Sequence, residues 1–365
     1  SDLAEMTSRG ATGPGQPNNL YLSNHSYGFV SGWLYVDNGS VIWEWFGNGS
    51  TSTGFEQDFG RYHTVSRDHD ALAFNAPYYL IFRSAGNDRT DNPSNGQAVA
   101  LSPGGNAITY NSSSHPTGDG LYRGGFETIS FSAVAKNVMT VGSANDAVSG
   151  GTRDPSRASI SSFSAWGPTD DGRIKPDIVA NGASLYSSLN TNNSAYGSFN
   201  GTSMSAPNAT GTAALLVDLY SSLFSGDAML SSTLKALLIH TADDLGNAGP
   251  DYKFGWGLID GKEAADLLQE HSNEPTKKRL TEAELTTSEP TRTDSFVWDG
   301  TSPIRATLCW ADPAGKATST SDLRTPRLVN NLQLKVLSPG GTEFLPFVMP
   351  VVGTWTQVSM DAPAV

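Results

Sequence analysis

Apolar runs typical of buried strands alternate with helical patterns through the middle of this chain, and that alternation constrains its fold most. A short helical pattern leads into a strand at 78–82, and a second buried strand follows at 137–144. Two helical patterns come next, at 200–220 and 232–243. Strands that alternate with helices usually form a parallel sheet covered on both faces. The sequence therefore predicts an α/β domain with a parallel sheet and helices on both sides.

The composition changes after residue 270. Residues 272–294 are charged, rich in threonine and free of aromatic side chains, which predicts a linker or an exposed crossover. Further along, apolar and polar residues alternate as in antiparallel strands, at 296–300, 304–312 and 330–344, with a Pro-Gly-Gly turn. We expect a first domain at 1–271 and an all-β, jelly-roll or barrel-like domain at 295–365. With only about 70 residues, that second domain is expected to be incomplete.

The negative net charge of the chain disfavours some classes of binding partner, nucleic acid above all. The formal charge is −13 and the isoelectric point is near 4.8. Proteins that bind nucleic acid concentrate lysine and arginine, so a nucleic-acid partner is not expected. No run reaches the roughly 18 apolar residues of a membrane-spanning helix, so no membrane span is expected either. The single cysteine, Cys309, allows no internal disulfide and is expected to be a small buried side chain.

One stretch carries recognisable chemistry. Residues 200–220, "NGTSMSAPNATGTAALLVDLY", place Ser203 at the start of an alanine-rich helix. The first N–H groups of a helix have no helical partner and carry partial positive charge, which favours an oxyanion forming beside a serine oxygen. The alternative is structural, because Thr202 or Ser203 could be an ordinary N-cap of this helix.

The longer string "GTSMSAP" resembles the nucleophile motif of the subtilases, the subtilisin-like serine proteases, and departs from it only at Ser205, where alanine is usual. "FRSAGND" is similar to the strand end that carries the family's oxyanion asparagine, and "LSNHSYGF" resembles its substrate-binding strand. The resemblance implies two catalytic residues, Ser203 and Asn87. It also implies two substrate-binding segments: Ser26, Tyr27 and Gly28, and Ser84, Ala85 and Gly86.

The resemblance extends over most of the chain, from about Leu20 to Phe344. Residues 163–182 resemble the family's Phe-Ser…Gly-Pro…Lys-Pro-Asp segment. The part after 295 is similar to the C-terminal β-barrel of the branch that includes the oxidatively stable alkaline proteases. This branch often binds calcium, so a structural calcium ion is implied as an option, with no cofactor for catalysis. Asn331 and Gln333 replace two acidic positions of the motif and only Asp312 remains, so the metal ligands stay unassigned.

The family's other catalytic residues have no counterpart in this sequence. No Asp-x-Gly or His-Gly-Thr motif precedes Ser26, and none of the six histidines lies in a matching context. A serine without a base is a poor nucleophile at neutral pH. Two explanations stay open: the chain is a fragment of a complete protease, which we favour, or it has lost catalysis. For a fragment, we expect that the missing segment is retained as a separate polypeptide or that the chain forms a homodimer.

The sequence thus predicts a secreted serine endopeptidase that acts on polypeptide substrates through an acyl-enzyme on Ser203. In this hypothesis Asn87 contributes to the oxyanion hole, and the two substrate-binding segments hold the peptide as an added strand. The second hypothesis, from another class, is a catalytically inactive subtilase-like module that binds peptides.

Overall fold

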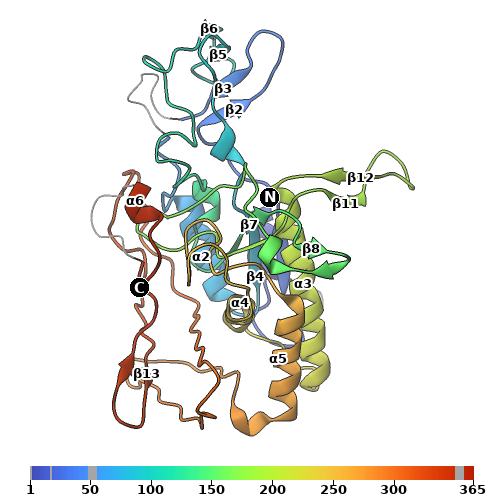
Figure 1. Cartoon of the computed structure of the whole chain (residues 1–365), viewed down its shortest axis with the longest axis vertical. Coiled ribbons are helices and arrows are strands. Elements are labelled where there is room, and N and C mark those ends of the chain that lie inside the picture. Colours follow the sequence, from blue (N-terminus) through green and yellow to red (C-terminus); the bar gives the residue numbers. More distant parts are fainter. Residues whose placement is uncertain (1, 17–18, 48–55, 350–356) are drawn as a thin grey trace.

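A four-stranded parallel sheet lies at the centre of the molecule (Figure 1). The computed structural model describes residues 2–16, 19–47, 56–349 and 357–365. The sheet has the order β1-β4-β7-β10. Its strands are β1 (Leu22–His25), β4 (Leu80–Ser84), β7 (Met139–Ala144) and β10 (Ile178–Asn181). Neighbouring strands pair in parallel, and β7 is buried along its whole length. The predicted parallel sheet is therefore confirmed.

Helices cover both faces of this sheet. One face packs against α3 (Thr202–Leu223), α4 (Ser231–His240) and α5 (Gly261–Asn273). The other face packs against α1 (Asp2–Arg9) and α2 (Thr64–Asn75). The arrangement confirms the predicted helices on both sides, with the main core between the sheet and α3 to α5.

Helix α3 lies directly on the sheet because the side chains that face it are small. Ala206, Ala209 and Ala213 recur at three- and four-residue spacing and are fully buried. This spacing puts them on one face of the helix, and methyl groups let the helix backbone approach the strands closely. The first turn of α3 is thereby fixed above the carboxyl ends of β1 and β4.

A second, smaller sheet lies at one end of the molecule (Figure 1). It has the order β2-β3-β5-β6, and its core is mostly aromatic. Its strands are β2 (Trp33–Tyr35), β3 (Trp43–Trp45), β5 (Ala98–Ala100) and β6 (Ile108–Thr109). Short apolar runs broken by glycine, asparagine and serine indicate strands in residues 18–57. No sequence pattern indicates the pairing of β3 with β5, which joins two distant segments.

The described part of the first 280 residues also contains two hairpins and four short 3-10 helices. The hairpins are β8 (Val148–Ser149) with β9 (Thr152–Arg153), and β11 (Leu185–Ser188) with β12 (Tyr196–Phe199). The 3-10 helices are η1 (Asp88–Thr90), η2 (Phe131–Ala133), η3 (Pro155–Arg157) and η4 (Pro275–Lys277). The β11–β12 hairpin projects from the body of the molecule and leads directly into α3 (Figure 1).

The part after residue 295 contains little regular structure among its described residues. β13 (Val336–Leu337) and β14 (Glu343–Phe344) form a small antiparallel sheet around the predicted Pro-Gly-Gly turn. A short helix, α6, spans Gln357–Met360. The prediction of strands at 296–300 and 304–312 is wrong, because the structure has no strand in either segment. Val297, for example, is fully exposed, so nothing packs against it as a partner strand would.

Residues 312–329 instead lie along the first domain and bond to it. Asp312 is buried, and its carboxylate accepts hydrogen bonds from Lys136 Nζ at 2.6 Å and from the Val329 N–H at 2.9 Å. The Tyr62 hydroxyl accepts from the Gly315 N–H at 3.1 Å. The division at 271 and 295 stays a prediction. Of the described residues, no helix is both long and apolar enough to cross a membrane.

Candidate active site

Ser203 lies in the first turn of α3 and is half-buried. Gly201 is the N-cap, and its N–H donates to the Gly182 carbonyl at 2.8 Å, which ties the helix start to the end of β10. The Ser203 hydroxyl donates to the Ser26 carbonyl at 3.1 Å. In return, the Ser26 hydroxyl donates to the Ser203 carbonyl at 2.9 Å. This reciprocal pair joins the start of α3 to the segment after β1.

The proline four residues after Ser203 explains why the Ser203 carbonyl is free to accept from the Ser26 hydroxyl. In a helix, the carbonyl of Ser203 would accept from the N–H of residue 207, but Pro207 has no N–H. The Ser203 carbonyl is therefore left without its helical donor, and the Ser26 hydroxyl takes that place. Pro207 thus makes a link between α3 and the substrate-strand segment possible without breaking the helix.

Asn87, just beyond the end of β4, has its side chain oriented by Thr202. Its Oδ1 accepts from the Thr202 N–H at 2.9 Å and from the Thr202 hydroxyl at 2.9 Å. A backbone N–H can only donate, so the oxygen of the Asn87 amide must face Thr202 and its Nδ2 must point the other way. Among the described residues, this Nδ2 has no acceptor. The side chain is exposed to solvent.

Two unused donors therefore meet beside the Ser203 hydroxyl. Of the first N–H groups of α3, that of Thr202 bonds to Asn87, and those of Met204 and Ser205 bond to the Gly201 carbonyl. In the described structure the Ser203 N–H has no acceptor. A Cβ built on Gly201 would lie 3.6 Å from Asn87 Nδ2 and 3.6 Å from Ser203 N. The two donors thus border one space, where they could bind a single oxygen that carries negative charge.

Sequence reasoning missed the part that Thr202 plays. Its hydroxyl also accepts from the Gly86 N–H at 3.2 Å, so one side chain connects the end of β4 to the start of α3. Thr202 is buried, with 1% of its surface exposed. The motif Gly-Thr-Ser contains this residue, but only the contact with Asn87 reveals why a hydroxyl is needed at position 202.

The predicted segment Ser26 to Gly28 lies next to Ser203 and is largely exposed. The Tyr27 carbonyl accepts from Arg83 Nη2 at 3.0 Å, and the Tyr27 hydroxyl lies 2.7 Å from Nδ1 of His25. Gly28 is closely packed, because a Cβ there would lie 2.7 Å from the hydroxyl oxygen of Ser132. An exposed apolar strip follows directly, formed by Tyr27, Phe29 and Val30. Such a strip next to Ser203 can accept the side chains of a peptide.

The predicted segment Ser84 to Gly86 is placed on the other side of Asn87 and is already bonded within the protein. The Ala85 N–H donates to the Val141 carbonyl at 3.0 Å, and the Gly86 carbonyl accepts from the Ala165 N–H at 3.0 Å. The Gly86 N–H is taken by Thr202. These groups cannot at the same time pair with an added strand, so this segment can offer a peptide a wall more readily than a hydrogen-bonding ladder.

The six histidines have structural partners, as the sequence predicts. Buried His69 bonds to the Val65 carbonyl and to Arg83, and burial lowers its pKa to about 4. The partners of the others are Tyr27 and Ser23 for His25, Val65 for His63, Asn111 for His115, Thr307 for His240 and Phe224 for His271. Within the described residues, no hydrogen bond joins a histidine to Ser203.

Carboxyl groups near the two donors are held partly protonated. Burial raises the pKa of Asp88 to about 7. Burial and the neighbouring Asp88 raise the pKa of Asp91 to about 7 as well. Buried Asp119 has its pKa raised well above the ordinary value, mainly by burial and then by Asp88. The region after Asn87 thus carries less negative charge at neutral pH than its sequence implies, which favours an oxyanion nearby.

The Lys-Pro-Asp string of residues 175–177 is structural. Buried Asp177 pairs with Lys175 Nζ at 2.5 Å and with Lys235 Nζ at 2.8 Å, and it accepts from the Thr140 N–H at 2.7 Å. These contacts hold β10, α4 and β7 together. Nearby charge lowers the pKa of Asp177 in spite of its burial, with Lys175 as the largest favourable cause. The string therefore fixes the sheet and does not contact Ser203.

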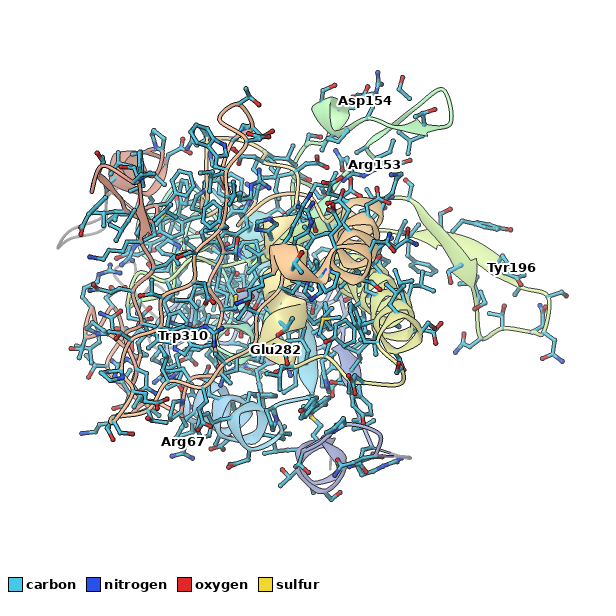
Figure 2. All side chains as sticks on the ribbon, turned by 90° about the horizontal axis from the view of Figure 1, so that it is seen from below. Arg67, Arg153, Asp154, Tyr196, Glu282 and Trp310 are labelled. Carbon is cyan, nitrogen blue, oxygen red and sulfur yellow. The ribbon has the colours of Figure 1, made fainter. Side chains whose placement is uncertain are left out.

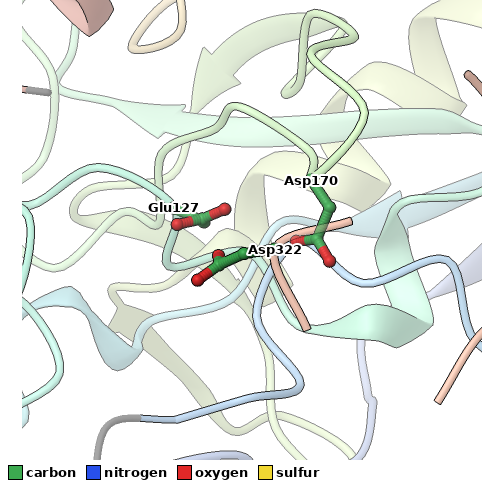
Figure 3. A group of neighbouring side chains, drawn as sticks. All are labelled: Glu127, Asp170 and Asp322. Carbon is green, nitrogen blue, oxygen red and sulfur yellow. The ribbon is translucent and has the colours of Figure 1, made fainter. Parts of the chain in front are cut away.

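One group of carboxylates is close enough to hold a metal ion. Glu127, Asp170 and Asp322 each place an oxygen within 4.8 Å of the others (Figure 3). Two guanidinium groups lie against this group. Arg123 pairs with Glu127 and, at 2.7 Å, with Asp322, and Arg324 lies 4.0 Å from Glu127 Oε1 and donates to the backbone carbonyl of Asp170 at 2.7 Å. The charges of the arginines balance two of the three carboxylates. Asp312, by contrast, is fully engaged by Lys136 and backbone N–H groups, so it does not fit a metal.

Known proteins resemble this chain over part of its length. The model of the family described as "Subtilase family" matches residues 3–257. The serine protease/ABC transporter B family protein tagA of Dictyostelium discoideum is 30% identical over 204 residues, which cover 48% of this chain and 11% of that protein. The C5a peptidase of Streptococcus pyogenes is 35% identical over 147 residues, which cover 38% of this chain and 11% of the peptidase.

A shorter match is more similar. The neisserial autotransporter lipoprotein NalP of Neisseria meningitidis serogroup B is 48% identical over 64 residues, which cover 18% of this chain and 5% of that protein. The chain thus spans about a tenth or less of the length of these curated relatives.

Proposed function

Because this chain belongs to the subtilase family of serine peptidases, we propose that it is a serine endopeptidase with Ser203 as its nucleophile. The observation that carries the proposal is the meeting of two unused donors, the Ser203 N–H and Asn87 Nδ2, beside the Ser203 hydroxyl. An N-cap alone would not need an asparagine beyond the end of β4, held so that its Nδ2 borders the same space as the Ser203 N–H.

In the proposed reaction, Ser203 Oγ attacks the carbonyl carbon of the scissile peptide bond and loses its proton to a general base. The carbonyl oxygen becomes an oxyanion and accepts hydrogen bonds from the Ser203 N–H and from Asn87 Nδ2. The C–N bond then breaks, the leaving amine takes the proton from the base, and an acyl-enzyme ester remains on Ser203. Water hydrolyses this ester by the same steps.

The segment Ser26 to Gly28 positions the substrate in this proposal. The Ser26 carbonyl holds the resting Ser203 hydroxyl at 3.1 Å, but a carbonyl cannot take its proton. We propose that a separate polypeptide segment supplies the base and the carboxylate that orients it, because no described histidine of this chain bonds to Ser203. That polypeptide would have to approach Ser203 from the side opposite Asn87, because the Asn87 side is occupied by the donors.

A fluorophosphonate probe, which reacts only with an activated serine, tests this proposal. The protein in its longest natural form should become labelled at Ser203, and a Ser203→Ala variant should not. The Ser205→Ala variant is the matched control, because Ser205 is buried two residues away and its hydroxyl bonds only to the Thr202 carbonyl. Absence of labelling in the parent protein, together with retained peptide binding, would instead favour the inactive peptide-binding module.

The proposal includes two further features, the location of the protein and a metal site. We propose that the protein is secreted, in line with the extracellular roles implied by names such as autotransporter lipoprotein among its relatives. We also propose that structural calcium lies at Glu127, Asp170 and Asp322, because carboxylate oxygens of all three lie within 4.8 Å of one another and calcium prefers oxygen ligands. Calcium should then raise the melting temperature relative to EDTA, and Asp322→Asn should abolish this rise. No effect of calcium on the parent would contradict the site.

A further inference from the structure

The β11–β12 hairpin has a composition unlike the rest of this acidic chain. Residues 183–200, "ASLYSSLNTNNSAYGSFN", contain no charged side chain, although the whole chain carries a formal charge of −13. Serine and asparagine make up half of the segment, and tyrosine and glycine are also present. Recognition loops of antibodies have this composition, because tyrosine gives contact area at low entropic cost and serine, glycine and asparagine give adaptable hydrogen bonding.

The two faces of the hairpin differ. The register pairs Tyr186 with Ser198 and Ser188 with Tyr196, so both tyrosines lie on one face. Their rings stack, with centroids 5.6 Å apart and planes at 21°. Even so, 72% of Tyr186 and 57% of Tyr196 are exposed. Figure 2 shows Tyr196 on the hairpin, clear of the body of the molecule. A stacked aromatic pair thus faces solvent.

The hairpin is rigidly attached at its base, next to Ser203. The Ser184 N–H donates to Asn200 Oδ1 at 2.6 Å, and the Gly201 N–H donates to Gly182. Strand β12 ends only four residues before Ser203. Tyr196 lies seven residues before Ser203, so the two residues are at most about 23 Å apart, the length of an extended chain of seven residues. Within the part of the chain that the structure describes, β11 and β12 pair only with each other, so each has an open outer edge.

We propose that this hairpin is an exosite that binds an uncharged, aromatic or aliphatic stretch of the polypeptide substrate, away from the bond that is cleaved. The stacked pair of Tyr186 and Tyr196 contacts the side chains of that stretch, and a free strand edge can pair with its backbone. The occupant is a substrate chain because the hairpin continues directly into the site of the proposed peptidase. The inference rests on the proposed function for this choice of occupant.

Peptide binding to the full chain in a Ser203→Ala background tests the exosite without requiring catalysis. The probes are a fluorescein-labelled 20-residue peptide of Leu, Tyr, Ser and Gly and a 6-residue peptide of the same composition. The variant Tyr186→Ser/Tyr196→Ser should raise the Kd of the long peptide about tenfold, which corresponds to about 1.4 kcal/mol. The short peptide cannot span the distance from Ser203, so its Kd should change much less.

Two variants separate recognition from folding. Tyr186→Phe/Tyr196→Phe keeps the stacked rings and should restore tight binding of the long peptide. Tyr35→Ser removes an exposed tyrosine of the small sheet and should leave binding as in the parent. If the double serine variant does not fold, the single Tyr186→Ser variant, at the more exposed position, replaces it.

Three results would overturn the exosite: an equal Kd of the long peptide in the parent and the serine variants, an equal loss with Tyr35→Ser, or a parent dimer that the serine variants dissociate. The last would show that a second copy is the occupant. Failure of the proposed function appears separately, as absence of fluorophosphonate labelling at Ser203, and leaves these binding results interpretable.

Discussion

Replacing Asn87 by aspartate should abolish catalysis and leave the fold intact. The aspartate side chain has the same shape, and one carboxylate oxygen can accept both hydrogen bonds from Thr202, at the place now taken by Asn87 Oδ1. A carboxylate at the start of α3 also gains about 0.3–1 kcal/mol from the helix dipole. The other oxygen replaces Nδ2, so a negatively charged acceptor stands where the proposed oxyanion needs a donor.

The size of the effect follows from two contributions. Loss of one oxyanion donor lowers kcat by about 10²–10³, a value known from the corresponding asparagine of subtilisin, a member of this family. Two unit charges about 4 Å apart repel by about 4 kcal/mol at an effective dielectric constant of 20. Together these lower the rate of acylation for Asn87→Asp by at least about 10⁴.

The variant Asn87→Ala is the comparison that separates catalysis from stability. It removes the same donor, so kcat should fall by about 10²–10³. It also leaves the Thr202 N–H unpaired at a buried residue, which should cost about 1–3 kcal/mol of unfolding free energy. The aspartate variant should therefore be the more stable and the less active of the two.

The assay measures the rate of fluorophosphonate labelling at Ser203 and the free energy of unfolding in urea. Each variant is made in the form of the protein in which the unmutated Ser203 becomes labelled. Thr202→Val serves as the control. It removes the hydroxyl but keeps the Thr202 N–H that orients Asn87, so its labelling rate should fall by no more than about tenfold. A labelling rate for Asn87→Asp within tenfold of the parent, or a loss of stability equal to that of Asn87→Ala, would refute the reasoning.

Two further predictions concern stability. Burial and the neighbouring Asp88 raise the pKa of Asp91 to about 7. Ionisation of Asp91 therefore destabilises the folded state, and this cost is absent below about pH 4 and complete above pH 7. Asp91→Asn should raise the melting temperature at pH 8 but hardly at pH 4.5, and equal gains at both pH values would count against this explanation. Asp312→Ala removes the nearer of the two carboxylates that pair with Lys136 and leaves the Val329 and Asn330 N–H groups without their acceptor. This should cost about 3–5 kcal/mol in urea unfolding, and a loss below about 1 kcal/mol would show that residues 312–329 do not stabilise the first domain.

The parallel sheet could be predicted because two of its strands, β4 and β7, lie in continuous apolar runs of the sequence. Strand β7 is buried on both faces, so every position of 139–144 is apolar or small. The segments 296–300 and 304–312 have an equally strand-like pattern, but this pattern shows only that each segment could form a strand if a partner strand lay beside it. Val297 is fully exposed in the structure, so the alternation there does not correspond to a packed sheet. Strand pairing depends on a partner, and the partner is not encoded in the segment itself.

The candidate site was predictable in its residues but not in its connections. Ser203 and Asn87 follow from motifs, whereas the contacts of Thr202 with Asn87 and of Ser26 with Ser203 join residues more than 100 positions apart. Local patterns carry no information about such contacts. The composition of the β11–β12 hairpin is visible in the sequence, but its exposure is not, because tyrosine and serine occur equally in covered hairpins.

The order Gly-Thr-Ser can now be given a physical reason at each position. Gly201 leaves open the space that Asn87 Nδ2 and the Ser203 N–H border, since any side chain there would start 3.6 Å from both. The Thr202 N–H and hydroxyl both donate to Asn87 Oδ1 and so orient the Asn87 amide. The Thr202 N–H is then no longer available to an oxyanion, but Asn87 Nδ2 is directed toward the site as a second donor. Ser203 can then keep its own N–H unpaired, because the next two N–H groups close on the Gly201 carbonyl. Exchange of positions 202 and 203 would give the orienting residue the free N–H and the nucleophile the bonded one, so the pair of donors would no longer meet beside the hydroxyl.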